Sequence, residues 1–136
     1  MPNYFFSGKV FSGTDEGKKF VAMKEYAAQM EEKLGFKPFL GTLNIRIHSS
    51  ELLSARQLRA HNGIFLKGFS RGGRKFFPVK CFPCLVFNEG EEAYGAVVVP
   101  NKTRYGTDVL EIVSPFNLRK KLGLRNGNKV SVEVFA

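Results

Sequence analysis

The chain has 136 residues, with 21 Lys and Arg against 12 Asp and Glu, a formal net charge of +9. Its length is near the commonest domain size, and 43% hydrophobic and 24% charged residues exclude disordered, collagen-like and coiled-coil proteins. No apolar run approaches the length of a membrane span, and the N-terminus shows no secretory signal pattern. We expect one soluble domain over residues 1–136. Two cysteines make a reducing cytoplasmic location the default. The positive charge suits a polyanion, a nucleic acid or a phosphorylated small molecule alike.

The first half of the chain predicts two strands around one helix. Residues 4–12 are aromatic and β-leaning and predict a strand, which a glycine-bracketed loop follows at 13–18. From residue 22 onward the spacing of apolar residues predicts an amphipathic helix, whose apolar face is formed by Met23, Tyr26, Ala27, Met30 and Leu34. Gly35 is placed to end this helix. Residues 42–48 alternate strictly between apolar and polar side chains and predict a half-buried strand.

The second half predicts mainly strands. Residues 49–60 predict a short polar helix capped by Ser49 or Ser50. A hairpin is expected from Ile64–Phe69 and Lys75–Phe87, with further strands at 96–100, 108–113 and 130–134. Ser114-Pro115 predicts the start of a helix that Gly123 ends.

Six or so strands with two or three short helices indicate a mostly β fold. The helices do not alternate regularly with the strands, which excludes a doubly wound parallel sheet. We expect a small closed barrel with the helices flanking it or filling its ends.

The loop at 13–18 resembles a phosphate-binding turn because it follows a strand and contains two glycines. It is not a P-loop, since three residues rather than four separate the glycines and Lys18 precedes another lysine. Lys18 could supply a counter-charge to a phosphate. The alternative is an ordinary surface turn.

Thr42 and Asn44 present a hydroxyl and an amide oxygen on one strand face, about 6.6 Å apart along the chain. Neutral oxygens that leave room for phosphate oxygens and water suit Mg²⁺. The alternative is a solvated strand face.

Glu111 is a carboxylate among the apolar side chains of Val109 and Val113 on one strand face. Burial would make it a candidate general base, and exposure would make it a surface glutamate. The predicted helix start at Ser114–Asn117 is a candidate site for an anion or a base edge.

Cys81-Phe82-Pro83-Cys84 is an isolated CxxC on a predicted strand. It has no partner pair and no histidine at zinc-finger spacing, so a zinc site is not expected. Residues three apart on a strand point to opposite faces, which argues against a disulfide between them.

Taken in order, these segments resemble the archaeal CTP-dependent riboflavin kinase family over essentially the whole chain. The resemblance rests on the Gly13–Gly17 loop, Lys18-Lys19-Phe20, Leu34-Gly35-Phe36, Gly41-Thr42-Leu43-Asn44, Gly95–Pro100, Thr103, Asp108–Ile112, Ser114–Arg119 and Leu122-Gly123-Leu124. Each segment alone is weakly specific, whereas the ordered set is specific.

The resemblance implies a cradle-loop β-barrel that transfers the γ-phosphoryl group of CTP to the 5′-hydroxyl of riboflavin, giving FMN and CDP. It implies Mg²⁺ held by Thr42 and Asn44, flavin contacts from Thr103 and Glu111, and catalytic roles for Glu111 and Asn44. The implied nucleotide-binding residues are Gly13, Thr14, Asp15, Glu16, Gly17, Lys18, Phe116, Asn117, Leu118 and Arg119. The expected partners are the two small-molecule substrates, and the expected state is a monomer.

A nucleic-acid-binding protein is the alternative. Leu122-Gly123-Leu124, Gly127 and the strand at 130–134 also resemble the end of the swapped-hairpin barrels of transcription regulators. The net charge of +9 fits such a role. Those modules are about half this length and do not need Gly41–Asn44 or Thr103.

Overall fold

The computed structural model describes residues 3–14, 16–100, 106 and 108–136. Within them, the helices are α1 (Glu16–Ala22), α2 (Lys24–Leu34), α3 (Leu52–Arg59) and α4 (Leu118–Leu122), with a short 3-10 helix, η1 (Ser49–Glu51). The strands are β1 (Asn3–Phe11), β2 (Leu43–Ile47), β3 (Ile64–Leu66), β4 (Phe69–Arg71), β5 (Arg74–Phe76), β6 (Val79–Asn88), β7 (Glu91–Pro100), β8 (Val109–Val113) and β9 (Lys129–Phe135). None of the described helices combines the length and the apolar character needed to cross a lipid bilayer.

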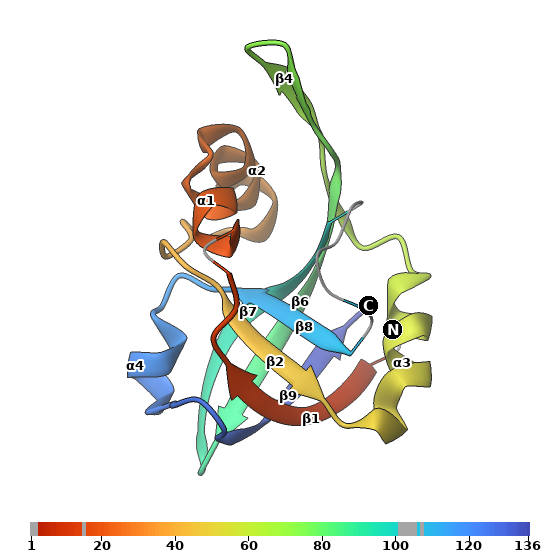
Figure 1. The fold of residues 1–136 in the computed structure, drawn as a ribbon, viewed down its shortest axis with the longest axis vertical. Coiled ribbons are helices and arrows are strands. Elements are labelled where there is room, and N and C mark those ends of the chain that lie inside the picture. The colour runs from red at the N-terminus through yellow and green to blue at the C-terminus, as the bar shows by residue number, and fades with distance from the viewer. Residues whose placement is uncertain (1–2, 15, 101–105, 107) are drawn as a thin grey trace.

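Six of the strands form the closed antiparallel barrel that the sequence predicts. They pair in the order β6-β7-β8-β2-β1-β9, and β9 pairs again with β6 to close the ring. Strand β3 adds to the barrel beside β6 (Figure 1). Because the ring has no open edge, each of its six strands is hydrogen-bonded to a neighbouring strand on both sides.

Two apolar cores result from the alternation of side chains along these strands. The barrel core lies inside the ring and contains Phe82, Ile45 and Leu110, which are almost fully buried. The outer core lies between the outside of the ring and α2, and it contains Tyr26 and Met30. The helix face predicted from residue 22 onward therefore packs on the outside of the barrel.

An arm formed by β4 and β5 projects from the barrel and stands beside α1 and α2 (Figure 1). Gly72 and Gly73 form its tip with φ angles of 57° and 77°, which glycine adopts without strain. Arg71 of the arm forms an ion pair with Glu25 of α2. At the base of the arm, the Tyr26 hydroxyl donates to the Phe77 carbonyl at 2.7 Å. The arm and α2 thus form one unit outside the barrel.

Two predicted boundaries of helices and loops were wrong. Glu16, Gly17 and Lys18 form the first turn of α1 rather than a loop. A helix does not start at Ser114-Pro115, because α4 begins after Asn117, whose side chain accepts a hydrogen bond from the Lys120 amide. Between these points, the Ser114 hydroxyl accepts from the Phe116 amide and shapes a turn.

The helix at residues 49–60 is also capped differently. The His48 side chain, rather than Ser49 or Ser50, accepts from the Ser50 amide. The predicted ends at Gly35 and Gly123 are confirmed, since both glycines adopt left-handed conformations with φ of 81° and 63°.

Candidate functional site

Three polar side chains converge on the outer surface of the barrel, where β2 and β8 pair. Asn44 of β2 lies directly opposite Glu111 of β8 in the antiparallel register. The Thr42 hydroxyl, one residue before β2, donates a hydrogen bond of 3.0 Å to the Glu111 carboxylate. Neighbours opposite one another in such a pair have Cβ atoms about 5 Å apart. The sequence-predicted metal ligands and the predicted base therefore meet in one cluster.

This cluster is buried rather than solvated. Asn44 is 6% exposed and Glu111 is 7% exposed, which excludes the alternative of a solvated strand face for either residue. The Oδ1 atom of Asn44 is buried and has no hydrogen-bond partner. Since a buried oxygen without a partner is unfavourable in a folded protein, this atom indicates a place for a ligand.

Gly17 covers the cluster. A Cβ atom at this position would lie 2.1 Å from Thr42 Oγ1 and 2.6 Å from Glu111 Oε2. Both distances are far below van der Waals contact, so only glycine allows α1 to lie this close to the two oxygens. Gly17, predicted as a nucleotide-binding residue, therefore lies against the cluster. Its position in the sequence does not show this contact.

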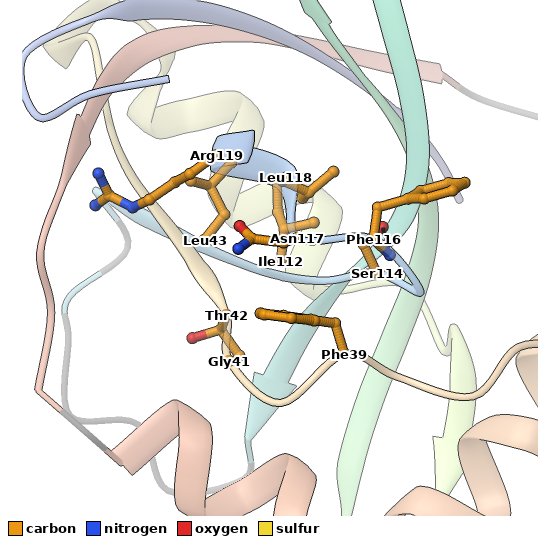
Figure 2. A pocket seen from close by; sticks show the side chains of 10 residues that line it. All are labelled: Phe39, Gly41, Thr42, Leu43, Ile112, Ser114, Phe116, Asn117, Leu118 and Arg119. Carbon is orange, nitrogen blue, oxygen red and sulfur yellow. Dashed lines mark hydrogen bonds between the residues drawn. The ribbon is translucent and has the colours of Figure 1, made fainter. Parts of the chain in front are cut away.

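A first cavity, of about 230 Å³, opens beside Thr42, and we call it the α4 pocket. Figure 2 shows Phe39 and Thr42 along one side of it and Asn117 and Arg119 along the other. Its lining residues are Phe39, Gly41, Thr42, Leu43, Ile112, Ser114, Phe116, Asn117, Leu118 and Arg119. The pocket thus joins the Gly41–Leu43 segment to the whole predicted segment Phe116–Arg119.

Arg119 is held in place by neighbours at the edge of the α4 pocket. Its Nη2 atom donates to the Asn126 side-chain oxygen at 2.8 Å and to the Phe11 carbonyl at 3.3 Å. The side chain extends away from α4 toward β1 (Figure 2). A fixed guanidinium at the edge of a pocket is suited to an anionic ligand.

A second cavity, of about 320 Å³, lies between α1, α2 and the base of the arm, and we call it the hairpin pocket. Four aromatic residues line it, namely Phe20, Tyr26, Phe76 and Phe77. Lys19, Arg74 and Lys75 supply positive charge, while Glu16 and Glu111 supply carboxylates. Aromatic walls with a few polar groups are typical of a site for a planar ring.

The two pockets meet at the hydrogen bond between Thr42 and Glu111. Thr42 lines the α4 pocket, and Glu111 lines the hairpin pocket. A ligand in each pocket would therefore bring its end toward the same pair of side chains. Group transfer between two bound molecules requires such an arrangement.

The remaining predicted site residues that the structure describes lie farther from the cluster of Thr42, Asn44 and Glu111. Gly13, Thr14 and Lys18 are exposed, and the Thr14 hydroxyl accepts from the Glu16 amide at 3.4 Å. Glu16 lines the hairpin pocket and not the α4 pocket. Asp15 and Thr103 lie outside the described residues. The structure thus brings Gly17 into the cluster and leaves Gly13, Thr14 and Lys18 outside the lining of both pockets.

Sequence reasoning missed most of the lining of the hairpin pocket. Phe20, Phe76 and Phe77 occur in apolar patterns that predict core packing equally well. Phe39 of the α4 pocket was also missed. No spacing rule marks these residues, because the arm and α2 approach each other only in the folded chain.

The two cysteines are structural. Cys81 lies in the outer core and Cys84 in the barrel core, so they point to opposite sides of β6 and form no disulfide. Burial raises the pKa of each thiol to about 12. In the described part of the chain, no three His, Cys, Asp or Glu side chains gather in a way that could hold a metal ion. Thr42 and Asn44 could offer neutral oxygens to a metal ion, since the Oδ1 atom of Asn44 is buried without a hydrogen-bond partner.

Comparison with known proteins identifies relatives along most of the chain. The family model CTP-dep_RFKase, described as a domain of unknown function, DUF120, matches residues 10–134. A riboflavin kinase of Archaeoglobus fulgidus is 46% identical over 127 residues, covering 93% of this chain and 53% of the relative. A riboflavin kinase of Thermoplasma acidophilum is 42% identical over 133 residues, covering 98% of this chain and 58% of the relative.

The chain spans between about half and three fifths of the length of these curated relatives. A third relative, a riboflavin kinase of Pyrobaculum islandicum, is 40% identical over 129 residues and is covered to 59%. The matched part includes the β2–β8 cluster and both pockets, because the family model begins at residue 10 and ends at residue 134. The chain therefore belongs to the family of archaeal CTP-dependent riboflavin kinases.

Proposed function

We propose that this protein is a CTP-dependent riboflavin kinase that transfers the γ-phosphoryl group of CTP to the 5′-hydroxyl of riboflavin, giving FMN and CDP. The acceptor is supported by the names of the relatives, and the nucleotide is supported by the name of the family. The observation that carries the proposal is the pair of pockets that meet at Thr42 and Glu111.

The nucleotide is assigned to the α4 pocket. Asn117 offers an amide group to a base or a ribose, Thr42 lies at the end next to Glu111, and Arg119 offers a positive charge at the edge. Lys18, exposed on α1, is the second cation that we assign to the phosphates. Charge neutralisation of this kind is the main demand that phosphoryl transfer makes on a protein.

Riboflavin is assigned to the hairpin pocket. Its ring system is flat and aromatic, and Phe20, Tyr26 and Phe77 provide aromatic walls from two sides of the pocket. Glu111 lines the same pocket, at the end next to Thr42. The ribityl chain would then carry its terminal hydroxyl to the carboxylate of Glu111.

Glu111 acts as the general base in this proposal. Its carboxylate orients the 5′-hydroxyl and accepts its proton as the oxygen attacks phosphorus. The hydrogen bond from Thr42 orients the carboxylate. The new bond joins the riboflavin oxygen to the γ-phosphorus, and the bond that breaks leaves CDP with its β-phosphate oxygen.

The residues at the cluster also fit Mg²⁺. The Oδ1 atom of Asn44 is buried without a partner, and Thr42 adds a hydroxyl oxygen nearby. Mg²⁺ prefers oxygen ligands and keeps several waters or phosphate oxygens, so two neutral protein oxygens suit it. Thr42 and Asn44 would hold the ion, which when bound offsets negative charge on the phosphate oxygens.

Incubation of the protein with riboflavin, MgCl₂ and either CTP or ATP tests the proposal. We expect FMN with CTP and a much lower rate with ATP. The Asn44→Ala and Glu111→Gln variants should keep the fold and lose turnover by about a hundredfold or more, because the first removes a proposed magnesium ligand and the second the proposed general base. Glu133→Gln on β9 is the matched control, because its carboxylate bonds Asn3 away from both pockets.

Two results would contradict the proposal. Wild-type rates in both cluster variants would remove Asn44 and Glu111 from the reaction. Absence of FMN with either nucleotide, together with salt-sensitive binding of duplex DNA, would favour the nucleic-acid-binding alternative.

A further inference from the structure

A chain of side-chain hydrogen bonds joins the α4 pocket to the end of β1. The Asn126 side-chain oxygen accepts from Arg119 Nη2 at 2.8 Å. The Asn126 amide nitrogen donates to the Ser12 hydroxyl at 2.9 Å. The same Asn126 oxygen also lies within 3.2 Å of the Ser12 hydroxyl, so the Asn126 amide joins Arg119 to Ser12.

Ser12 is the residue at which the chain leaves β1. The segment that follows leads within a few residues to Gly17, which contacts Thr42 and Glu111. Arg119 also donates to the Phe11 carbonyl at 3.3 Å, so two consecutive residues at the end of β1 are tied to α4. These bonds join the end of β1 to Arg119 and Asn126.

The turn that carries Asn126 has its own anchors. The Gly127 amide donates to the Val10 carbonyl at 2.7 Å, and the Val10 amide donates to the Asn128 carbonyl at 3.0 Å. The Asn128 side chain accepts from the Arg125 amide at 2.6 Å. These bonds shape the turn without the Asn126 side chain, which leaves that side chain for contacts outside the turn.

We propose that Asn126 is a positioning residue for the nucleotide: it holds the Arg119 guanidinium at the edge of the α4 pocket and ties it to Ser12. This inference rests on the proposed assignment of the α4 pocket to the nucleotide. Among the described contacts of the Arg119 guanidinium, removal of the Asn126 amide leaves its longer hydrogen bond to the Phe11 carbonyl, so the guanidinium gains freedom. Binding the nucleotide then requires ordering the guanidinium again, which weakens binding.

The test compares Asn126→Ala with Asn126→Asp. The alanine variant should raise the KM for CTP by about tenfold, the cost of a charge-assisted hydrogen bond, and leave the KM for riboflavin unchanged. The aspartate variant keeps an acceptor for both Arg119 and Ser12 and should stay within about twofold of the wild type. Asn128→Ala is the matched control, expected to lower the melting temperature without a selective change in the KM for CTP.

Action through Arg119 has a separate signature. In an Arg119→Lys background, where the guanidinium is absent, Asn126→Ala should add little to the KM for CTP, because contacting residues are not additive. A full additional tenfold loss would overturn the proposal. An unchanged KM for CTP in Asn126→Ala, in an enzyme that turns over normally, would also overturn it while the proposed function stands.

Direct binding separates this inference from the proposed function. Calorimetric titration with CTP and MgCl₂, without riboflavin, should show the same loss of affinity in Asn126→Ala. If the wild type binds CTP but forms no FMN, the kinase assignment fails and the titration still decides the role of Asn126. If the wild type does not bind CTP at all, both proposals fail.

Discussion

The two pockets rest on different cores of the molecule. Leu43, Ile112 and Leu118 line the α4 pocket and belong to the core inside the barrel. Tyr26 and Val79 line the hairpin pocket and belong to the core outside it. The first pocket is thus supported by strands that hydrogen bonds close into a ring. The second is supported by a helix and an arm that contact the barrel mainly through side chains.

This difference has a consequence for dynamics. Opening the barrel core requires breaking a continuous ladder of backbone hydrogen bonds, whereas the outer core can loosen when α2 and the arm move. Regions with fewer such bonds open at lower free energy. We expect the hairpin pocket to adapt to its ligand and the α4 pocket to be largely preformed.

The largest effect is expected at Gly17. This residue of α1 lies against Thr42 of the α4 pocket and Glu111 of the hairpin pocket, so a change there affects both pockets at once. In Gly17→Ala, the added methyl group would collide with Thr42 Oγ1 and Glu111 Oε2. Turnover should fall by about a hundredfold or more while circular dichroism shows a folded barrel. Lys24→Ala, on the exposed side of α2, is the control and should keep wild-type turnover. Normal activity in Gly17→Ala would mean that α1 can move away without cost.

The two buried thiols allow the opening of the two cores to be measured separately, since Cys81 lies in the outer core and Cys84 in the barrel core. At pH 8, alkylation should modify Cys81 of the outer core about tenfold faster than Cys84 of the barrel core, because the outer core opens more readily. Single variants Cys81→Ala and Cys84→Ala assign each rate. Equal rates would show that both cores open only in global unfolding.

The same thiols predict a pH dependence of stability. Burial holds both pKa values at about 12 in the folded chain, against an ordinary value of 9.0. Below pH 9 the thiols are protonated in both states and make no difference. As the pH rises from 9 toward 12, only the unfolded chain loses these protons, so the free energy of unfolding should decrease. Urea titration of the wild type and of the alanine variants measures this contribution.

The smallest effect is expected from Tyr26→Phe. Loss of the hydroxyl that bonds the Phe77 carbonyl should loosen the base of the arm and raise the KM for riboflavin by about threefold. The KM for CTP should not change. Phe39→Ala in the α4 pocket is the matched variant and should show the opposite selectivity. If both variants changed both KM values equally, the two pockets would not be separate sites.

Local sequence patterns were sufficient to predict the barrel. The strict alternation at 42–48 and 130–134 places one side chain in the core and the next outside it, and that period of two is specific to strands. Gly35 and Gly123 marked helix ends correctly, since left-handed conformations favour glycine. The start of α1 could not be predicted in this way, because Gly17 is a poor helix former that is required by its contact with Thr42.

The candidate site, too, was predicted only in part from the sequence. Sequence alone singled out Glu111 as a carboxylate among apolar side chains on one strand face. Thr42 and Asn44 lie on the polar face of an alternating strand, and it was the resemblance to a known family that favoured a metal site there over a solvated face. Only the tertiary structure decided that Asn44 and Glu111 are neighbours across two strands, that both are buried, and that a pocket lies on each side of them. The physical reason is that strand register, burial and cavities arise from contacts between segments far apart in the chain, whereas sequence patterns report the conformation of each segment alone.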